Sequence, residues 1–183
     1  MIIYLVGLSC VGKTTVGKML AEELGFSFFD LDKEVENYYG ESIERLQRRF
    51  GMRKFREKAA RVLEKLFSRQ ENSVISGPPS GLKFAYLRVY KRYENPNLIS
   101  VYLHDSFENI VNRLTFYDID SNPLEIHLDD AMKKQYIREL KKDYNYFKKS
   151  YSRADFKINI ENVPLEDIPK KIINETGLKN FIR

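Results

Sequence analysis

The residues with the clearest chemistry lie near the start of the chain, where Gly7, Gly12, Lys13 and Thr14 fit the spacing G-x-x-x-x-G-K-[ST]. Glycines at these positions let the backbone turn tightly and bring successive N–H groups towards an anion. The lysine of such a P-loop reaches the β- and γ-phosphates of a nucleotide, and the following hydroxyl can ligate Mg²⁺. The members predicted to bind nucleotide phosphates are Gly7, Ser9, Cys10, Val11, Gly12, Lys13, Thr14 and Thr15.

The segments on either side of this loop have the pattern that its chemistry needs. Residues Ile2–Val6 form a short apolar run rich in β-forming residues, which predicts a buried strand. After Lys13 the apolar residues recur at helical spacing up to Leu24, and Gly25 follows where a helix would end. A coincidental glycine turn would also match the spacing. Strand, loop and helix in this order favour the phosphate site, because the helix N-terminus then points its N–H groups at the anion.

Two carboxylates follow the next predicted strand, at residues 26–29, in the run Asp30-Leu31-Asp32. In α/β folds the ligands bind at the carboxyl ends of strands, and residues two apart that leave a strand can share a direction. One carboxylate could join the shell of Mg²⁺, directly or through water, and the other could accept a hydrogen bond from an attacking hydroxyl. The alternative is a solvated pair that caps the following helix. Their place after a phosphate loop favours the functional interpretation.

Arg56 lies at the start of a long amphipathic helix predicted from Phe55. A guanidinium there could clamp an anionic group of a substrate through two parallel hydrogen bonds. The alternative is a basic solvent face stabilised by acidic residues four positions away. Periodicity alone does not choose between Arg56 and Arg53.

The rest of the chain alternates between predicted strands and helices. Further strands are predicted at residues 73–76, 98–103 and 156–160. Helices are predicted at residues 33–39, 44–50, 55–67, 82–93, 107–114, 129–152 and 165–173. Residues 117–128 are polar and contain Asn122-Pro123, so we expect a mobile loop there. The alternation predicts an α/β fold of three layers, a five-stranded parallel sheet covered by helices on both faces. No repeat or linker divides the chain, which predicts a single domain over residues 1–183.

The composition limits the classes of protein to which the chain can belong. Its 183 residues, of which 43% are hydrophobic, suit one globular domain. No apolar run approaches the ~20 residues of a membrane span, and the N-terminal run leads straight into the phosphate loop. We therefore expect a cytoplasmic protein with no cleaved signal and no membrane partner. The single cysteine excludes an internal disulfide and offers no metal cluster.

The formal charge of +5 would suit either nucleic acid or phosphates and small anions. Lysine and arginine are mixed with aspartate and glutamate along most of the chain, and no nucleic-acid-binding motif is visible. We therefore expect a nucleotide and a small molecule as ligands of a monomer, and no nucleic acid.

The order and spacing of these motifs resemble the shikimate kinase family over most of the chain, most strongly before residue 70. The resemblance rests on the phosphate loop and its continuation to Ala21, Phe29-Asp30-Leu31-Asp32, Gly40-Glu41-Ser42-Ile43, Phe55-Arg56, and the segment from Val101 to Leu114. In that family the enzyme moves the γ-phosphoryl group of ATP to a ring hydroxyl of a small carboxylic acid. The resemblance also implies a place in aromatic amino acid biosynthesis.

The resemblance implies roles for individual residues. Thr14 and Asp30 would serve Mg²⁺, and Lys13 and Asp32 would be catalytic. Asp32 would also contact the substrate hydroxyls, Arg56 would bind the substrate carboxylate, and Arg113 would lie near the adenine. Residues 33–70 would form the substrate-binding helices, and residues 117–128 would form a lid.

Three features on the substrate side depart from the family pattern. The family has three glycines after the third strand, whose backbone contributes to the substrate pocket, and here the run is Gly77-Pro78-Pro79. Gly77 keeps its expected place in the pocket, but the second residue of the run has no N–H to donate. The lid arginine of the family is replaced by Asn122, which removes a charge that would stabilise the transition state. The second substrate arginine falls on Phe147 or, in another frame, on Lys142.

The sequence therefore predicts a kinase that uses ATP and Mg²⁺ to phosphorylate a hydroxyl of a small molecule. Shikimate, converted to shikimate 3-phosphate, is the leading acceptor. Another small polyol acid or a nucleotide is the alternative acceptor, because the basic stretches would suit a phosphate-bearing molecule. A regulatory protein that binds ATP without turnover is the alternative from a different class, and the missing lid arginine supports it.

Overall fold

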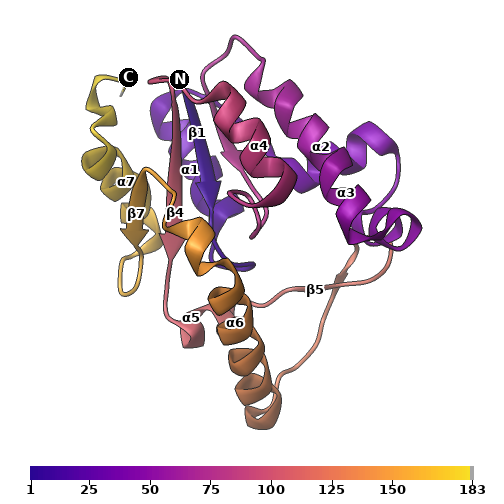
Figure 1. The fold of residues 1–183 in the computed structure, drawn as a ribbon. Helices are drawn as coiled ribbons and strands as arrows, with labels where there is room; N and C mark the ends of the chain where they lie inside the picture. The colour runs from indigo at the N-terminus through magenta and orange to yellow at the C-terminus, as the bar shows by residue number, and fades with distance from the viewer. Residues whose placement is uncertain (182–183) are drawn as a thin grey trace.

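A parallel sheet lies at the centre of the computed structural model, which describes residues 1–181 (Figure 1). The strands are β1 (Ile2–Val6), β2 (Ser27–Asp30), β3 (Ser73–Ser76), β4 (Leu98–His104) and β7 (Phe156–Asn159), in the spatial order β2-β3-β1-β4-β7. Every pairing between them is parallel, which confirms the predicted five-stranded parallel sheet. The last two residues of the predicted domain, 182 and 183, lie outside the described residues.

Helices cover both faces of this sheet (Figure 1). They are α1 (Lys13–Leu24), α2 (Leu31–Tyr39), α3 (Ile43–Phe67), α4 (Phe84–Tyr93), α5 (Phe107–Asn112), α6 (Asp130–Tyr151) and α7 (Ile168–Thr176). The crossover from β1 to β2 runs towards one edge of the sheet, whereas the later crossovers run towards the other edge. Because parallel crossovers are right-handed, α1 covers one face, and α3 and α4 cover the opposite face. Helix α7 packs beside α1.

The start of the chain does not alternate between polar and apolar residues, because β1 is the central strand of the sheet. Ile3, Tyr4, Leu5 and Val6 are all fully buried, as expected for a parallel strand covered on both faces. The carboxyl end of β1 leads directly into the glycine loop, so the position of that loop is set by the most deeply buried part of the molecule.

The chain around Asp30 differs from the prediction at two boundaries. Strand β2 begins at Ser27 and includes Asp30, and α2 begins at Leu31 rather than at Lys33. The cause is the carboxylate of Asp30, which accepts hydrogen bonds from the N–H groups of Asp32 and Lys33 and so caps the helix two residues earlier. Asp32 therefore lies in the first turn of α2 and not in a link before it.

Three other helices begin or bend at places that the periodicity did not predict. The helices predicted at residues 44–50 and 55–67 are joined in α3, which bends at Gly51 (φ 72°, ψ 155°). Glycine adopts this left-handed φ easily, so the helix resumes in a new direction without a loop. Helix α4 begins at Phe84, two residues later than predicted. The predicted last helix begins as a 3₁₀ turn at Leu165–Asp167 and becomes α-helical only from Ile168 to Thr176.

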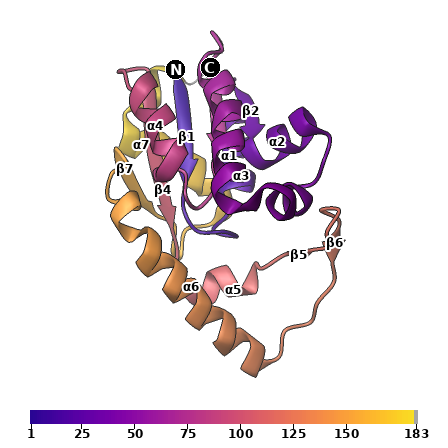
Figure 2. The same cartoon turned by 45° about the vertical axis from the view of Figure 1, so that its right-hand side comes forward.

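Residues 117–128, predicted as an irregular loop, contain part of a hairpin. Strand β5 (Phe116–Tyr117) pairs antiparallel with β6 (Pro123–Leu124). The carboxylate of Asp118 closes the turn by accepting hydrogen bonds from the N–H groups of Asp120 and Asn122. Figure 2 shows this hairpin beside α2 and α3, joined to α5 and α6 by extended connections.

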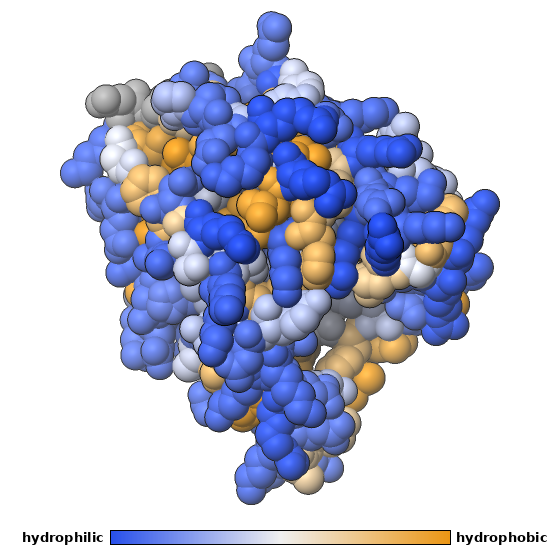
Figure 3. Space-filling model, in the orientation of Figure 1, coloured by the Kyte–Doolittle hydropathy of each residue, from blue (hydrophilic) through white to orange (hydrophobic). Residues whose placement is uncertain are grey.

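Helix α6 projects from the body of the molecule (Figures 1 and 2), and hydrophilic side chains cover the projecting part (Figure 3). Its exposed basic residues are Lys134, Arg138, Lys141, Lys142, Lys148 and Lys149. Leu140, Phe147 and Tyr151 are buried on its other side. Over residues 1–181, a helix with the length and apolarity to span a membrane is not found.

Candidate functional site

The phosphate loop has the backbone geometry that its glycines predict. Gly7 has a φ of 150° and Gly12 a φ of 105°, both values that side-chain-bearing residues rarely adopt. A Cβ atom at Gly7 would lie 2.5 Å from the carbonyl oxygen of Leu103, at the end of β4. Gly12 is the N-cap of α1 and makes no side-chain capping bond, so the first N–H groups of the helix face the loop. The loop can therefore wrap an anion with its backbone.

Lys13 is held inside this loop. Its side chain is only 8% exposed, and its ammonium group donates to the carbonyl oxygens of Gly7 (3.0 Å) and Leu8 (2.8 Å). Burial lowers the pKa of Lys13 to about 8, while the nearby carboxylates of Asp32 and Asp30 oppose that shift. The ammonium group is therefore charged at neutral pH and lies where an anion bound by the loop would meet it.

Asp30 has both of the roles that the sequence left open, because it caps a helix and also contacts the phosphate loop. One carboxylate oxygen, Oδ1, caps α2, and the other, Oδ2, accepts a hydrogen bond of 2.7 Å from the hydroxyl of Thr14. The hydroxyl of Ser76, at the end of β3, lies 3.5 Å from that of Thr14. These hydroxyl and carboxylate oxygens suit Mg²⁺, which binds through one or two carboxylates together with substrate phosphates.

Asp32 and Arg56 both influence the ionisation of Tyr86, a residue that sequence reasoning missed. The carboxylate of Asp32 is reached by solvent, yet the surrounding protein removes enough water to raise its pKa to about 6, with Asp30 adding to the shift and Lys13 opposing it. Burial raises the pKa of the Tyr86 phenol. Asp32 raises it further, and Arg56 lowers it. The two charged groups therefore act on the same phenol. We call Asp32, Arg56 and Tyr86 the acceptor cluster.

The structure also distinguishes Arg56 from Arg53. The side chain of Arg53 is 94% exposed and pairs with Glu57 at 3.6 Å, so it belongs to the basic solvent face. Arg56 is half-buried, and its guanidinium carbon lies 4.4 Å from the ring centroid of Phe84 on α4. Of the two arginines, Arg56 is thus the one that packs against α4, the helix that carries Tyr86.

The position of Gly77 is fixed by a hydrogen bond within the sheet and by packing against Tyr4. Its N–H donates to the carbonyl oxygen of Leu5 at 2.9 Å, and a Cβ atom there would lie 2.6 Å from the ring of Tyr4. The N–H of Gly81 donates to Pro78. The expected contact of Gly77 with a substrate therefore cannot use its N–H, which is already bonded within the sheet.

The remaining predicted positions have partners of their own. Arg113 forms an ion pair with Asp105, which follows the end of β4, and the carbonyl of Leu103 in that strand adjoins Gly7. The side-chain amide of Asn122 donates to Asp118 within the hairpin turn. Phe147 is buried, and Lys142 is exposed.

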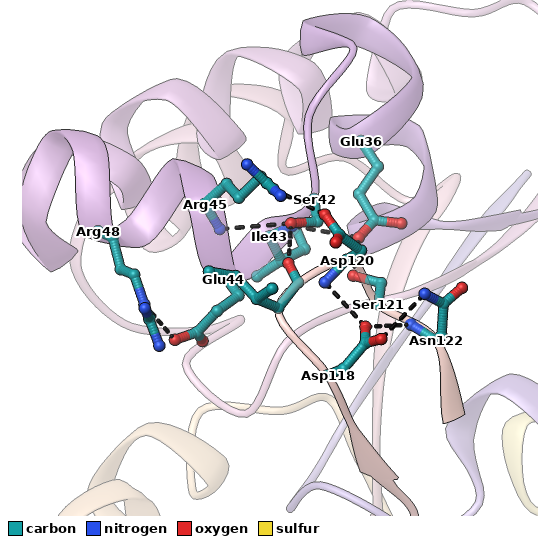
Figure 4. Close-up of polar contacts among 11 residues, drawn as sticks. Glu36, Ser42, Ile43, Glu44, Arg45, Arg48, Asp118, Asp120, Ser121 and Asn122 are labelled. Carbon is teal, nitrogen blue, oxygen red and sulfur yellow. Dashed lines mark hydrogen bonds and ion pairs between the residues drawn. The ribbon is translucent and has the colours of Figure 1, made fainter. Parts of the chain in front are cut away.

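The hairpin tip is tied to the corner between α2 and α3 by three polar contacts (Figure 4). They are Ser42 Oγ to Ile119 O at 2.5 Å, Ser121 Oγ to Glu36 Oε1 at 2.5 Å, and Arg45 Nε to Asp120 Oδ1 at 2.7 Å. We call these contacts the hairpin latch. Glu36 lies four residues after Asp32, so the latch is attached to the helix that carries this carboxylate. The partners are 75–85 positions apart, and no local pattern could have paired them.

The sheet order, the glycine loop after the central strand and the carboxylates at the end of β2 together define an α/β kinase of the P-loop class. Comparison with known proteins narrows this class. The family model described as shikimate kinase matches residues 9–176. The chain belongs to the shikimate kinase family.

Individual relatives agree with this assignment. A shikimate kinase of Persephonella marina is 34% identical over 173 residues, which covers 94% of each chain. The crystal structure of shikimate kinase from Aquifex aeolicus has a TM-score of 0.72 at 29% identity and covers 97% of this chain and 96% of its own. The shikimate kinase from Acinetobacter baumannii in complex with shikimate has a TM-score of 0.74 at 29% identity and covers 98% and 93%. The similarity spans the whole domain and not the phosphate loop alone.

Proposed function

We propose that this protein transfers the γ-phosphoryl group of ATP to a ring hydroxyl of shikimate and forms shikimate 3-phosphate. The observation that carries the proposal is the arrangement at the phosphate loop, where the hydrogen bond from Thr14 to Asp30 brings the segment Asp30-Leu31-Asp32 beside the loop that buries Lys13. A hydroxy acid needs both a group that accepts its hydroxyl proton and a cation for its carboxylate. Membership of the shikimate kinase family and the likeness to the shikimate complex from Acinetobacter baumannii support the same acceptor.

The nucleotide side fits ATP with Mg²⁺. In this proposal Lys13 exchanges its bonds to the loop carbonyls for bonds to the phosphates, and Thr14 and Asp30 supply oxygens for the ion. When bound, the ion neutralises charge on the transferring phosphates. The loop backbone from Gly7 through Ser9, Cys10, Val11 and Gly12 to Thr15 surrounds the phosphate groups, and Arg113 lies towards the adenine.

Asp32 holds the acceptor hydroxyl and takes its proton as the new phosphate ester forms. With a pKa of about 6, the carboxylate is ionised at neutral pH and still has measurable affinity for a proton, which suits a general base. Lys13, with a pKa of about 8, is charged over the same range. The two groups therefore have their working ionisation states together between pH 6 and 8.

We assign residues 33–70 to the acceptor-binding helices and residues 117–128 to a lid, so that residues 1–183 form one kinase domain. The hairpin latch is the contact between these two parts. We further propose a monomeric, cytoplasmic enzyme of aromatic amino acid biosynthesis.

Phosphorus NMR of the reaction products tests the proposal. Wild-type protein incubated with MgATP and shikimate is expected to give ADP and one new phosphate monoester, assigned to the 3-position by its coupling to the ring proton. The Asp32→Asn protein should bind ATP and give no ester above background. If wild-type protein binds ATP and forms no ester, the proposal is wrong. Trials with other polyol acids and nucleotides would then separate a different acceptor from a protein that holds ATP without turnover.

A further inference from the structure

The positive charge of this protein is concentrated on one helix. Helix α6 has seven lysine and arginine side chains and three acidic ones, so its 22 residues hold a net charge of +4. The whole chain of 183 residues has a formal charge of +5. The rest of the chain is therefore nearly balanced, and the excess charge lies on the helix that projects from the body (Figures 1 and 2).

The exposed cations of α6 share one face of the helix. Successive residues of an α-helix are turned by about 100°, which brings six exposed cations within one arc of about 120°. We call them the α6 cationic face: Lys134, Arg138, Lys141, Lys142, Lys148 and Lys149. Between its ends the acidic residues, Glu139 and Asp143, lie outside this arc, and the buried residues of α6 lie on the opposite side. The face is thus a positive stripe about 22 Å long.

Within residues 1–181, the cations of this face are not neutralised by carboxylates. The ion pairs of this part of the chain engage cations of α2, α3, α4 and α7, and they include no member of the α6 cationic face. Arg138 Nε donates to the carbonyl oxygen of Lys134 at 3.3 Å, and Lys148 Nζ donates to Asn145 Oδ1 at 3.3 Å. These neutral acceptors leave the positive charges in place.

The cationic face destabilises the isolated helix. Arg138 is four positions from both Lys134 and Lys142, and like charges at that spacing repel one another on a helix surface. The side chains of the face are exposed, and hydrophilic groups cover this part of the molecule (Figure 3). An anionic partner laid along α6 would remove the repulsion and gain the attraction of the whole stripe. The charge pattern therefore favours a partner with several negative charges in a row.

The surroundings of the face favour carboxylates over nucleic acid. Proteins that bind single-stranded nucleic acid stack its bases on aromatic rings beside the cations. Most aromatic residues of α6 are buried or half-buried on the side away from the face: Tyr136, Tyr144, Phe147 and Tyr151. Tyr146 is exposed, but Lys83 Nζ lies 3.3 Å from its ring centroid. Five of the six cations are lysines, which lack the planar fork with which arginine binds phosphate.

We propose that the α6 cationic face docks an acidic segment of a partner protein. Residues four positions apart in a helix are separated by a rise of about 6 Å. A partner helix with glutamates four positions apart has the same spacing, so it can place one carboxylate beside each turn of α6. The inference goes beyond the proposed function and does not depend on it, because that proposal gives none of the six side chains a role.

Fluorescence anisotropy with a labelled synthetic peptide tests the docking. The peptide has about 20 residues, so that it can form a helix, with glutamate at every fourth position among alanines. A matched peptide has glutamine at the same positions. We expect the full chain to bind the glutamate peptide and not the glutamine peptide at about 0.05 M salt, and to bind it more weakly at about 0.3 M. No binding of the glutamate peptide would overturn the proposal.

Two triple variants of equal net charge locate the binding. The first removes three charges of the α6 cationic face: Lys134→Gln, Arg138→Gln and Lys141→Gln. The second removes three exposed charges elsewhere: Lys18→Gln, Lys157→Gln and Lys170→Gln. We expect the first to raise Kd for the glutamate peptide about tenfold and the second to raise it less than about threefold. Equal losses would show that binding follows net charge alone, and the docking surface would be wrong.

A reversed face gives the complementary result. We expect a folded protein with Lys134→Glu, Arg138→Glu and Lys141→Glu to lose the glutamate peptide and to bind a peptide with lysine at the same positions. Thermal unfolding of each variant identifies a loss that comes from the fold. A reversed-face protein that unfolds at the wild-type temperature and binds neither peptide would contradict the pairing of the two helices.

An oligothymidylate of the same charge as the glutamate peptide decides between classes of partner. We expect the wild-type protein to bind the oligothymidylate more weakly than the peptide, because the face has no free aromatic rings among the described residues. Tighter binding of the oligothymidylate, abolished by the first triple variant, would assign the face to nucleic acid and overturn the proposal.

Discussion

The nucleotide side and the proposed acceptor side of the candidate site are built in different ways. The nucleotide side is one short segment whose shape is imposed by backbone, with glycines at left-handed φ and a carbonyl of β4 too close to Gly7 for any side chain. The acceptor side is assembled from side chains on α2, α3 and α4, with a hairpin attached from a distant segment. A site made by backbone leaves a compact pattern in the sequence. A site made by side chains can exchange its members while the fold stays the same.

The largest effect should come from the nucleotide side. Lys13→Met removes the one buried cation of the loop, and we expect kcat to fall by about 10³-fold or more, because a fixed charge at the transferring phosphate is lost. Lys18→Met, exposed on the same helix, is the control and should keep wild-type activity. ADP release is the measurement. A Lys13→Met protein with more than a tenth of wild-type kcat would show that this side is not organised around its lysine.

The pH dependence of kcat/KM should report on both the acceptor side and the nucleotide side of the site. Asp32 must be ionised to accept the hydroxyl proton, and its pKa is raised to about 6, so kcat/KM for shikimate should fall about tenfold per unit below pH 6. Lys13 must be protonated, and its pKa is lowered to about 8, so kcat/KM for ATP should fall above pH 8. Rates measured from pH 5 to 9 test this. A flat acid limb would contradict the role given to Asp32.

The backbone character of the nucleotide side can be tested through stability. Gly7→Ala adds a Cβ atom 2.5 Å from a backbone oxygen, whereas Gly40→Ala adds one to open space at a φ that is also left-handed. We expect Gly40→Ala to lower the free energy of unfolding by about 1 kcal/mol. Gly7→Ala should cost a further 1–3 kcal/mol or so. Equal losses in urea unfolding would mean that the loop can move away from β4.

The smallest effect should come from the hairpin latch. Arg45 and Asp120 are each about half exposed, and such pairs contribute at most about 1 kcal/mol. Arg45→Ala should therefore raise KM for shikimate less than about fivefold and leave kcat for saturated enzyme nearly unchanged. Arg48→Ala, one turn further along α3 and paired with Glu44, is the matched control. A tenfold fall in kcat would show that the latch is part of the catalytic arrangement.

The same contrast explains what the sequence could predict. The five strands and the phosphate loop were predictable because buried strands are continuous apolar runs and the glycine spacing is local. The start of α2 was not predictable, because one oxygen of the Asp30 carboxylate caps the helix while the other accepts a hydrogen bond from Thr14. Helix periodicity also could not show that Gly51 bends α3 without ending it.

The acceptor side was predictable only where a resemblance supplied it. Arg56 could not be separated from Arg53 by periodicity, since the choice depends on the ring of Phe84 in another helix. No local signal pointed to Tyr86 or to the latch residues, because each acquires its neighbours through packing of segments distant in the chain.

The most direct test of the central claim is the initial rate of ADP release from MgATP with and without shikimate, for wild type and Asp32→Asn. The account predicts shikimate-dependent release by wild type and a fall of about 100-fold or more in Asp32→Asn, with ATP binding intact in both. Undiminished release by Asp32→Asn, or release by wild type that does not depend on shikimate, would contradict it.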